Sequence, residues 1–168
     1  MIKYGRVLLV LYILMLIWLL LFKLSFHIST FLHNHHRNLN LIPFAAPSIV
    51  NGGINFGEMI MNAVFFIPFG LLLNVNFKKS GFWLKLFLIL VFSLSVESLQ
   101  YIFAIGASDI TDIITNTFGG FLGLILYYLC SRFIVSERLD KLIVFTGTVL
   151  FVLFVCIHLS HFMIRPGR

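Results

Sequence analysis

A concentrated group of side chains capable of chemistry lies in residues 93–123, a stretch that is otherwise largely apolar. The stretch contains three of the chain's six carboxylates and two side-chain amides, namely Glu97, Gln100, Asp109, Asp112 and Asn116. Ionisable groups within apolar helices are costly to bury and are usually functional. Such carboxylates exchange protons, bind a ligand or cation, or link helices by hydrogen bonds, and each role is a candidate here.

Glu97 is the sharpest candidate among them. In the functional interpretation it exchanges a proton or binds a ligand. In the structural interpretation it is protonated, or it is hydrogen-bonded to Gln100 or Asn116. Ser93, Glu97 and Gln100 are spaced i, i+4 and i+7, so they share one helix face. That common face predicts one polar cluster rather than scattered polar positions.

Asp112 and Asn116 are four residues apart, which also places them on one helix face. They would bind a head group or a metal, or else hydrogen-bond to another helix at about 0.6–2 kcal/mol per contact. Asp109 stands just before an apolar run and is expected to cap a helix there. Asn62 is expected to join two helices, with lining the same cleft as its alternative role.

Histidine spacing offers a weaker, metal-binding hypothesis. His158 and His161 lie at i and i+3, so they could bind a metal together with Glu97 or Asp112. The denser group of histidines consists of His33, His35 and His36. Neighbouring histidines need further ligands from elsewhere to make a good site, so we expect no metal. The sequence also has no nucleotide-binding loop, and we expect no cofactor.

The composition is that of a membrane protein. The chain is 60% hydrophobic and 11% charged, and its mean hydropathy is +1.05; a soluble domain is about 25% charged. The net charge is +6, but the basic residues flank the apolar runs, as the positive-inside rule expects. The charge therefore does not indicate nucleic-acid binding.

Five apolar runs are long enough to cross a bilayer. The predicted spans cover roughly residues 7–26, 59–77, 82–105, 110–130 and 142–163. The sequence therefore predicts an all-α integral membrane protein, with residues 1–168 forming a single multi-pass domain. We expect the first helix to be retained, because its apolar run is long and no small-residue cleavage site follows it.

The distribution of basic residues predicts the N-terminus inside and the C-terminus outside. The segments assigned to the inside hold Lys3, Arg6, Lys78, Lys79, Lys85, Arg132, Arg138 and Lys141, and those outside hold half as many. Helix lengths then place the polar residues of several spans in the outer third of the membrane. The inner halves are expected to be nearly all apolar.

Two connections differ in character. Residues 27–58 are rich in turn formers and only moderately hydrophobic, so we expect them to lie on the membrane surface or fold back over the helices. Residues 131–141 are expected to form a charged loop. Cys130 and Cys156 lie at different depths in this topology and are not expected to pair.

Small residues predict close helix packing. Gly119 and Gly123 form a GxxxG motif, which lets another helix approach closely. Pro68 and Gly70 interrupt the second span and predict a kink and a close contact. The sequence leaves the oligomeric state open.

Four motifs follow one another within residues 40–125. They are Asn40-Leu-Ile-Pro-Phe, Asn62-x5-Pro68-x-Gly70, Glu97-x2-Gln100 and Asp109-x2-Asp112-x3-Asn116-x2-Gly119-Gly120-x2-Gly123. This ordered set resembles the VanZ-like family of bacterial membrane proteins. Two departures are the absence of an arginine just before Asp109 and the presence of Thr111 where some relatives have a second acid. The resemblance implies a multi-pass protein of the bacterial cell membrane that lowers susceptibility to glycopeptide antibiotics such as teicoplanin.

The leading functional hypothesis is a protein with no demonstrable enzymatic activity. Its outward-facing polar cleft would interact with membrane lipids or lipid-linked wall precursors and reduce the access of a lipoglycopeptide to its target. The alternative is an intramembrane enzyme acting on a lipid head group, with Glu97 as general acid or base and Asp112 and Asn116 orienting the substrate. A small transporter is the third hypothesis, and the apolar inner halves argue against it.

Overall fold

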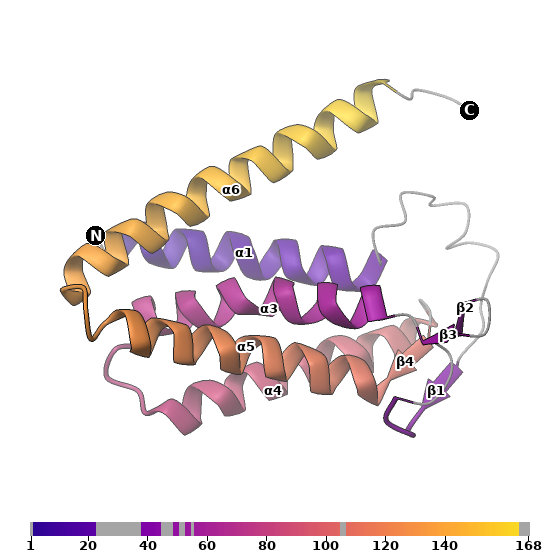
Figure 1. The fold of residues 1–168 in the computed structure, drawn as a ribbon. Helices are drawn as coiled ribbons and strands as arrows, with labels where there is room; N and C mark the ends of the chain where they lie inside the picture. Colours follow the sequence, from indigo (N-terminus) through magenta and orange to yellow (C-terminus); the bar gives the residue numbers. More distant parts are fainter. Residues whose placement is uncertain are drawn as a thin grey trace.

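Five long helices form the fold in the computed structural model, which describes residues 2–22, 38–44, 49–50, 53–54, 56–104 and 107–164. They are α1 (Ile2–Phe22), α3 (Phe56–Asn76), α4 (Phe82–Phe103), α5 (Ile110–Cys130) and α6 (Ser136–Ile164), shown in Figure 1. Each is long and apolar enough to cross a membrane. The predicted all-helical fold with five candidate spans is therefore confirmed, whereas the orientation of the termini stays a prediction.

The helix ends differ from the sequence boundaries where charged residues extend a helix beyond its apolar run. Helix α1 begins at Ile2, and α6 begins at Ser136, so most of the expected charged loop 131–141 is helical. Leu139 and Asp140 are buried in this first part of α6. Hydropathy detects only the hydrocarbon-spanning part of a helix, and it therefore misses turns that continue into the membrane–water interface.

Short strands lie at one end of the bundle. Strand β1 (Asn38–Asn40) pairs in parallel with β4 (Ala107–Asp109), with Asn40 opposite Asp109. Strands β2 (Ile49–Val50) and β3 (Gly53–Ile54) form a separate antiparallel pair. The described part of the connection between α1 and α3 thus folds back over the helix ends. This is one of the two arrangements expected from the sequence. We call this end of the bundle, where α3 and α5 begin and α4 ends, the loop end.

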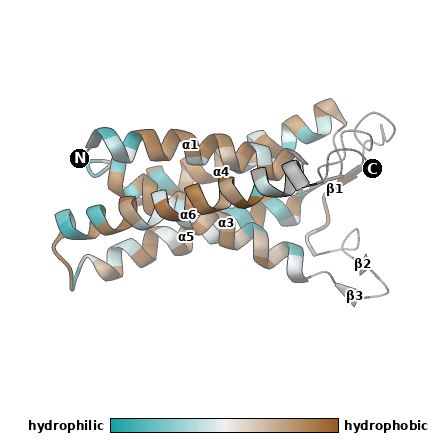
Figure 2. Cartoon of the chain, turned by 90° about the horizontal axis from the view of Figure 1, so that it is seen from above, coloured by the Kyte–Doolittle hydropathy of each residue, from teal (hydrophilic) through white to brown (hydrophobic). Residues whose placement is uncertain are grey.

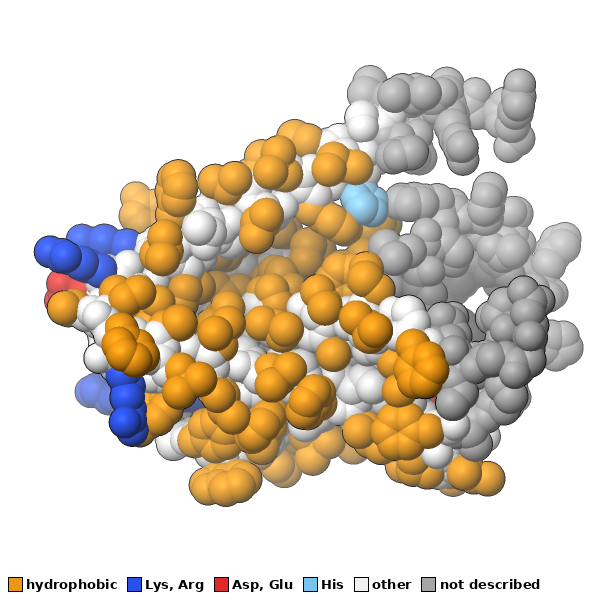
Figure 3. Space-filling model, in the orientation of Figure 1, with side chains coloured by type: hydrophobic (Ala, Val, Ile, Leu, Met, Phe, Trp, Pro, Cys, Tyr) orange, Lys and Arg blue, Asp and Glu red, His pale blue; other side chains and the backbone are white. Residues whose placement is uncertain are grey.

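The opposite end is basic. It holds all the Lys and Arg side chains that the structure describes. Those visible in Figure 3 lie together on one side of the molecule. Asn76 at the end of α3 donates a hydrogen bond to the carbonyl of Gly5 in α1, at 3.1 Å, which joins two helices there. We call this the basic end. Figure 2 shows the hydrophobic residues along the middle of the helices, between these two ends.

Helices α3 and α5 form the tightest contact of the bundle. A Cβ atom at Gly119 would overlap the backbone carbonyl of Ala63, and one at Gly123 would overlap that of Ile67. The GxxxG motif is therefore used within the chain, where it lets the two backbones approach closely. Helix α3 runs through Pro68 without ending. This contact fixes the register of α3 against α5, and with it the positions of the polar side chains on both.

Helix α6 stands apart from the other four helices. In Figure 1 it diverges from α1 along its length. Its apolar side chains are largely exposed, including Phe145, Leu150 and Leu153. Cys130 is half-buried in α5 and Cys156 is exposed in α6, and both are free, as expected. Exposure of so many apolar groups along one helix suits a lipid-facing segment.

Candidate functional site

Asp112 and Asn62 join α5 to α3 at the loop end. Asn62 Nδ2 donates a hydrogen bond to Asp112 Oδ1 at 2.8 Å, and Asp112 is only 6% exposed. The register set by the glycine contact brings these two residues together, because Asn62 directly precedes Ala63 and Asp112 lies about two turns before Gly119. Asn62 is thus confirmed as a link between helices. Its partner is a buried carboxylate of the candidate site.

Glu97 is buried, with 3% of its surface exposed, and lies next to strand β4, which leads into α5. Ser108 Oγ donates to Glu97 Oε2 at 3.0 Å, and the backbone N–H of Asp109 donates to the same oxygen at 3.1 Å. These partners replace the Gln100 and Asn116 expected from the sequence. The Glu97 carboxylate therefore holds strand β4 against α4.

Gln100 points toward α1 instead. Its Nε2 donates to the backbone carbonyl of Leu20 at 2.9 Å, and its Oε1 is buried without a described partner. Gln100 shares the buried face of α4 with Ser93 and Glu97, as the spacing predicted. The sequence identified the shared face correctly. It could not indicate that Gln100 would bond to α1 while Glu97 bonds to β4.

Asp109 caps α5, which confirms the expectation for this residue. Its Oδ1 accepts a hydrogen bond from the backbone N–H of Thr111 at 2.8 Å. Its Oδ2 accepts a second one from Asn40 Nδ2 at 3.1 Å. One carboxylate therefore both satisfies a free N–H of the helix and fastens β1 to β4.

Thr111 is a structural residue that sequence reasoning missed. Its Oγ1 accepts a hydrogen bond from the backbone N–H of Phe44 at 3.0 Å. Phe44 has a φ of 57°, a left-handed conformation that is uncommon outside glycine. The neutral Thr111 hydroxyl thus holds the segment after β1 in place. The family resemblance implies an acid at this position in some relatives. The motif Asn40-Leu-Ile-Pro-Phe was the only sequence signal for this contact.

Asn116 links α5 to α4 deeper in the bundle. Its Nδ2 donates to Ser93 Oγ at 3.1 Å, and the residue is 1% exposed. Its Oδ1 is buried and has no hydrogen-bond partner among the described residues. Unsatisfied buried oxygens are uncommon because each costs the desolvation of an acceptor. The Asn116 oxygen and the Gln100 oxygen are therefore buried acceptors without a described donor.

The structure gives the metal hypothesis no support within the part of the chain that it describes. No group of three or more His, Cys, Asp and Glu side chains gathers there. The His158 ring packs edge-on against Trp18 of α1 and lies close to Phe154. His33, His35 and His36 fall outside the described residues, and so does the side chain of His161.

A second buried polar group lies at the basic end, which corrects the expectation that the inner halves are nearly all apolar. Lys85 is 6% exposed, and its Nζ donates to Asn74 Oδ1 at 2.7 Å. Lysine early in a span was read as a flanking residue, because the sequence does not show which way a side chain turns. The fully buried Phe66, Ile89 and Leu124 lie between this group and the loop-end residues along α3, α4 and α5.

The fold and its polar residues define a class of protein. It is a helical protein with five candidate membrane spans, and it buries a hydrogen-bonded acidic cluster at one end of the bundle. Residues 9–131 match the family described as VanZ/LLP1. The chain is also similar to Protein VanZ of Enterococcus faecium, with 54% identity over 149 residues. The matched residues make up 89% of each of the two chains. The chain belongs to the VanZ/LLP1 family. No solved structure matches it.

Proposed function

We propose that this protein lies in the bacterial cell membrane and lowers susceptibility to glycopeptide antibiotics of the teicoplanin type. The loop-end cluster would carry the activity by binding cell-envelope lipids or lipid-linked wall precursors. We define the loop-end cluster as Asn62, Glu97, Gln100, Asp109, Asp112 and Asn116. Membership of the VanZ/LLP1 family supports the antibiotic part of the proposal.

The observation that carries the binding part is the pair formed by Asp112 and Asn116. Both are buried on one face of α5, and Asn116 Oδ1 lacks a described partner. A carboxylate and an unsatisfied amide oxygen one turn apart offer acceptors to hydroxyl and amino groups. Sugars, peptides and many lipid head groups carry such donors.

The charge distribution supports an outward position for this cluster. The basic end would lie in the cytoplasm under the positive-inside rule, which leaves the loop end at the outer surface. Glycopeptides act on lipid-linked precursors at that surface. The apolar layer around Phe66, Ile89 and Leu124 would close the cluster toward the cytoplasm. Such a closed site favours binding over transport.

The geometry also bears on the enzymatic alternative. Glu97 Oε2 accepts two hydrogen bonds that fix β4, which suits a positioning role better than that of a general base. In a catalytic version of the proposal, Asp112 would be the better placed carboxylate. A changed profile of lipids or lipid-linked precursors, abolished by Asp112→Asn, would support that version.

Expression in a susceptible bacterial host tests the proposal. The wild-type chain is expected to raise the teicoplanin concentration needed to stop growth. Asp112→Asn keeps the side-chain shape but removes the charge, and we expect it to abolish most of that effect. Asn116→Ala is expected to weaken it as well, because the free Oδ1 is lost.

The matched control is Glu137→Gln, which neutralises an exposed acid at the basic end. It should protect as well as the wild type, with membrane levels of every variant compared by immunoblotting. If the wild-type chain leaves teicoplanin susceptibility unchanged, the antibiotic proposal is wrong. If Asp112→Asn protects fully at an equal membrane level, the assignment of the loop-end cluster is wrong.

A further inference from the structure

A cavity at the basic end lies on the opposite side of the apolar layer from the loop-end cluster. It has a volume of about 350 Å³ and lies among the end of α3, the start of α4, the end of α5 and the start of α6. Its lining includes Lys78, Lys85, Tyr127, Ser131 and Ser136. This volume is near the lower end of the range for ligand pockets, about 300–1,000 Å³, and suits a head-group-sized molecule.

Lys85 gives the cavity an undercompensated cation. Its ammonium group can donate three hydrogen bonds, and the one described partner is Asn74 Oδ1. Asn74 Nδ2 in turn donates to the carbonyl of Leu124 at 3.3 Å, which keeps Oδ1 turned toward the lysine. A buried ammonium matched only by a neutral amide is costly, so an anion in the cavity would stabilise it.

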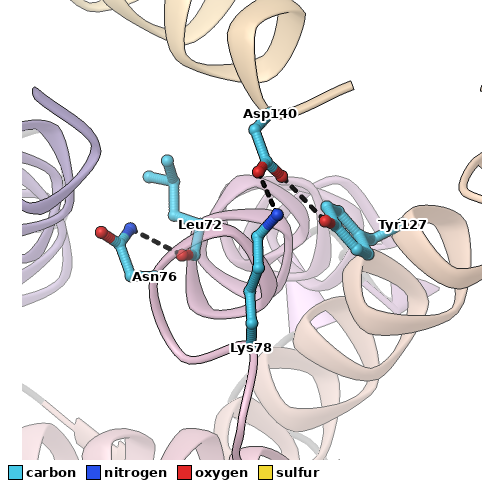
Figure 4. Close-up of polar contacts among 5 residues, drawn as sticks. All are labelled: Leu72, Asn76, Lys78, Tyr127 and Asp140. Atoms are coloured by element: carbon cyan, nitrogen blue, oxygen red, sulfur yellow. Dashed lines mark hydrogen bonds and ion pairs between the residues drawn. The ribbon is translucent and has the colours of Figure 1, made fainter. Parts of the chain in front are cut away.

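The nearby acid is already engaged. Asp140 forms an ion pair with Lys78 and accepts a hydrogen bond from Tyr127 Oη at 2.8 Å, and both groups point at it in Figure 4. Asp140 itself does not line the cavity. Its charge is therefore balanced by Lys78, which leaves the charge of Lys85 without a carboxylate among the described residues.

The backbone adds to the positive character of this cavity. Helix α4 begins beside it, at Phe82, and its N-cap residue is Gly81, which has no side chain to cap the first N–H groups. Helix α6 begins beside it at Ser136. Helix N-termini carry partial positive charge and free N–H groups, which favour phosphate oxygens. Two helix starts and a buried lysine therefore surround one small space.

We propose that this cavity binds a phosphate group, with Lys85 as its main contact. The apolar part of the lining, which includes Phe82 and Leu124, favours a phosphate attached to a lipid over a free one. Trp83, which follows Phe82 in α4, is exposed, and an exposed tryptophan suits the membrane–water interface, where phospholipid head groups lie. The site is separate from the loop-end cluster and does not depend on the proposed antibiotic function.

Ligand-induced shifts in unfolding temperature test this site in the full-length protein, purified in a neutral detergent. The probes are short-chain phosphatidylglycerol, the matching diacylglycerol without phosphate, and inorganic phosphate. Phosphatidylglycerol is expected to stabilise the protein saturably and diacylglycerol is not. Binding of inorganic phosphate as well would identify a general phosphate site, whereas binding of the lipid alone would identify a head-group site.

Lys85→Met is expected to weaken phosphatidylglycerol binding about tenfold or more, as loss of a charged hydrogen bond predicts. Should that variant fail to fold, Lys85→Gln provides the test, because glutamine keeps a hydrogen-bond donor for Asn74 but carries no charge. The control is Lys79→Met, which removes an exposed neighbouring charge outside the cavity. The proposal is overturned if no phosphate probe binds, or if Lys79→Met weakens binding as much as the cavity variants do.

Discussion

At the loop end, the described hydrogen-bond donors to the buried carboxylates are neutral groups, whereas at the basic end Asp140 is paired with Lys78. Asp112 is bonded to Asn62, and Glu97 to Ser108. The loop end therefore concentrates buried carboxylates and amide oxygens, whereas the basic end holds a buried lysine whose described partner is an amide oxygen. The two ends should attract ligands of opposite character, donors at one and anions at the other.

The contact between α3 and α5 joins these two ends, so breaking it should have the largest effect. Gly119→Ile would place a branched side chain on the backbone of Ala63, which cannot move aside as a flexible side chain would. We expect a loss of stability on the order of 3 kcal/mol or more, since overpacking at this contact separates two helices. Size-exclusion chromatography in detergent should show loss of the monodisperse species.

Gly81→Ala is the matched control for that substitution. Nothing lies within 4 Å of a Cβ at this position, and the residue has a φ of −64°. It should therefore behave as the wild type does. Equal behaviour of the two glycine variants would contradict the role assigned to the α3–α5 contact.

A smaller change should affect the loop end alone. Asp109→Ala removes both the cap of α5 and the contact with Asn40, and we expect a cost of about 1–2 kcal/mol in the free energy of unfolding. Asp109→Asn keeps a good capping group and should cost much less. Thermal unfolding in detergent measures both. A similar loss in the two variants would show that capping is not what Asp109 contributes.

The same variant separates the two ends functionally. Asp109→Ala should leave phosphatidylglycerol binding at the basic end unchanged, because β1, β4 and the cap lie across the apolar layer from Lys85. Weakened binding in a folded Asp109→Ala protein would show that the two ends are coupled. That result would remove the basis for treating them as independent sites.

Much of the fold follows from composition and spacing. Long apolar runs predict the five helices, and Asp109 before such a run predicts a cap. Which elements pack against each other was harder to predict from the sequence. The glycines at 119 and 123 indicate close packing, but not that α3 is the partner. A three-residue strand such as β1 carries too little periodicity to be detected.

The candidate site was predictable to the same degree. The shared faces of α4 and α5 could be read from helical spacing, and the link through Asn62 was expected. The burial of Lys85 was not, because a lysine near a span end usually extends its side chain toward water. Whether it does so depends on which neighbouring helix covers it, and that is set by tertiary packing.

The central claim is that the loop end faces the outside of the cell and the basic end faces the cytoplasm. Labelling of single cysteines in intact cells tests this claim most directly. Ile42 at the loop end is 67% exposed and Phe133 at the basic end is 90% exposed. In a chain with Cys130 and Cys156 replaced by serine, a membrane-impermeant maleimide should label Ile42→Cys and leave Phe133→Cys unlabelled until the cells are opened. Labelling of Phe133→Cys in intact cells, with Ile42→Cys protected, would contradict the account.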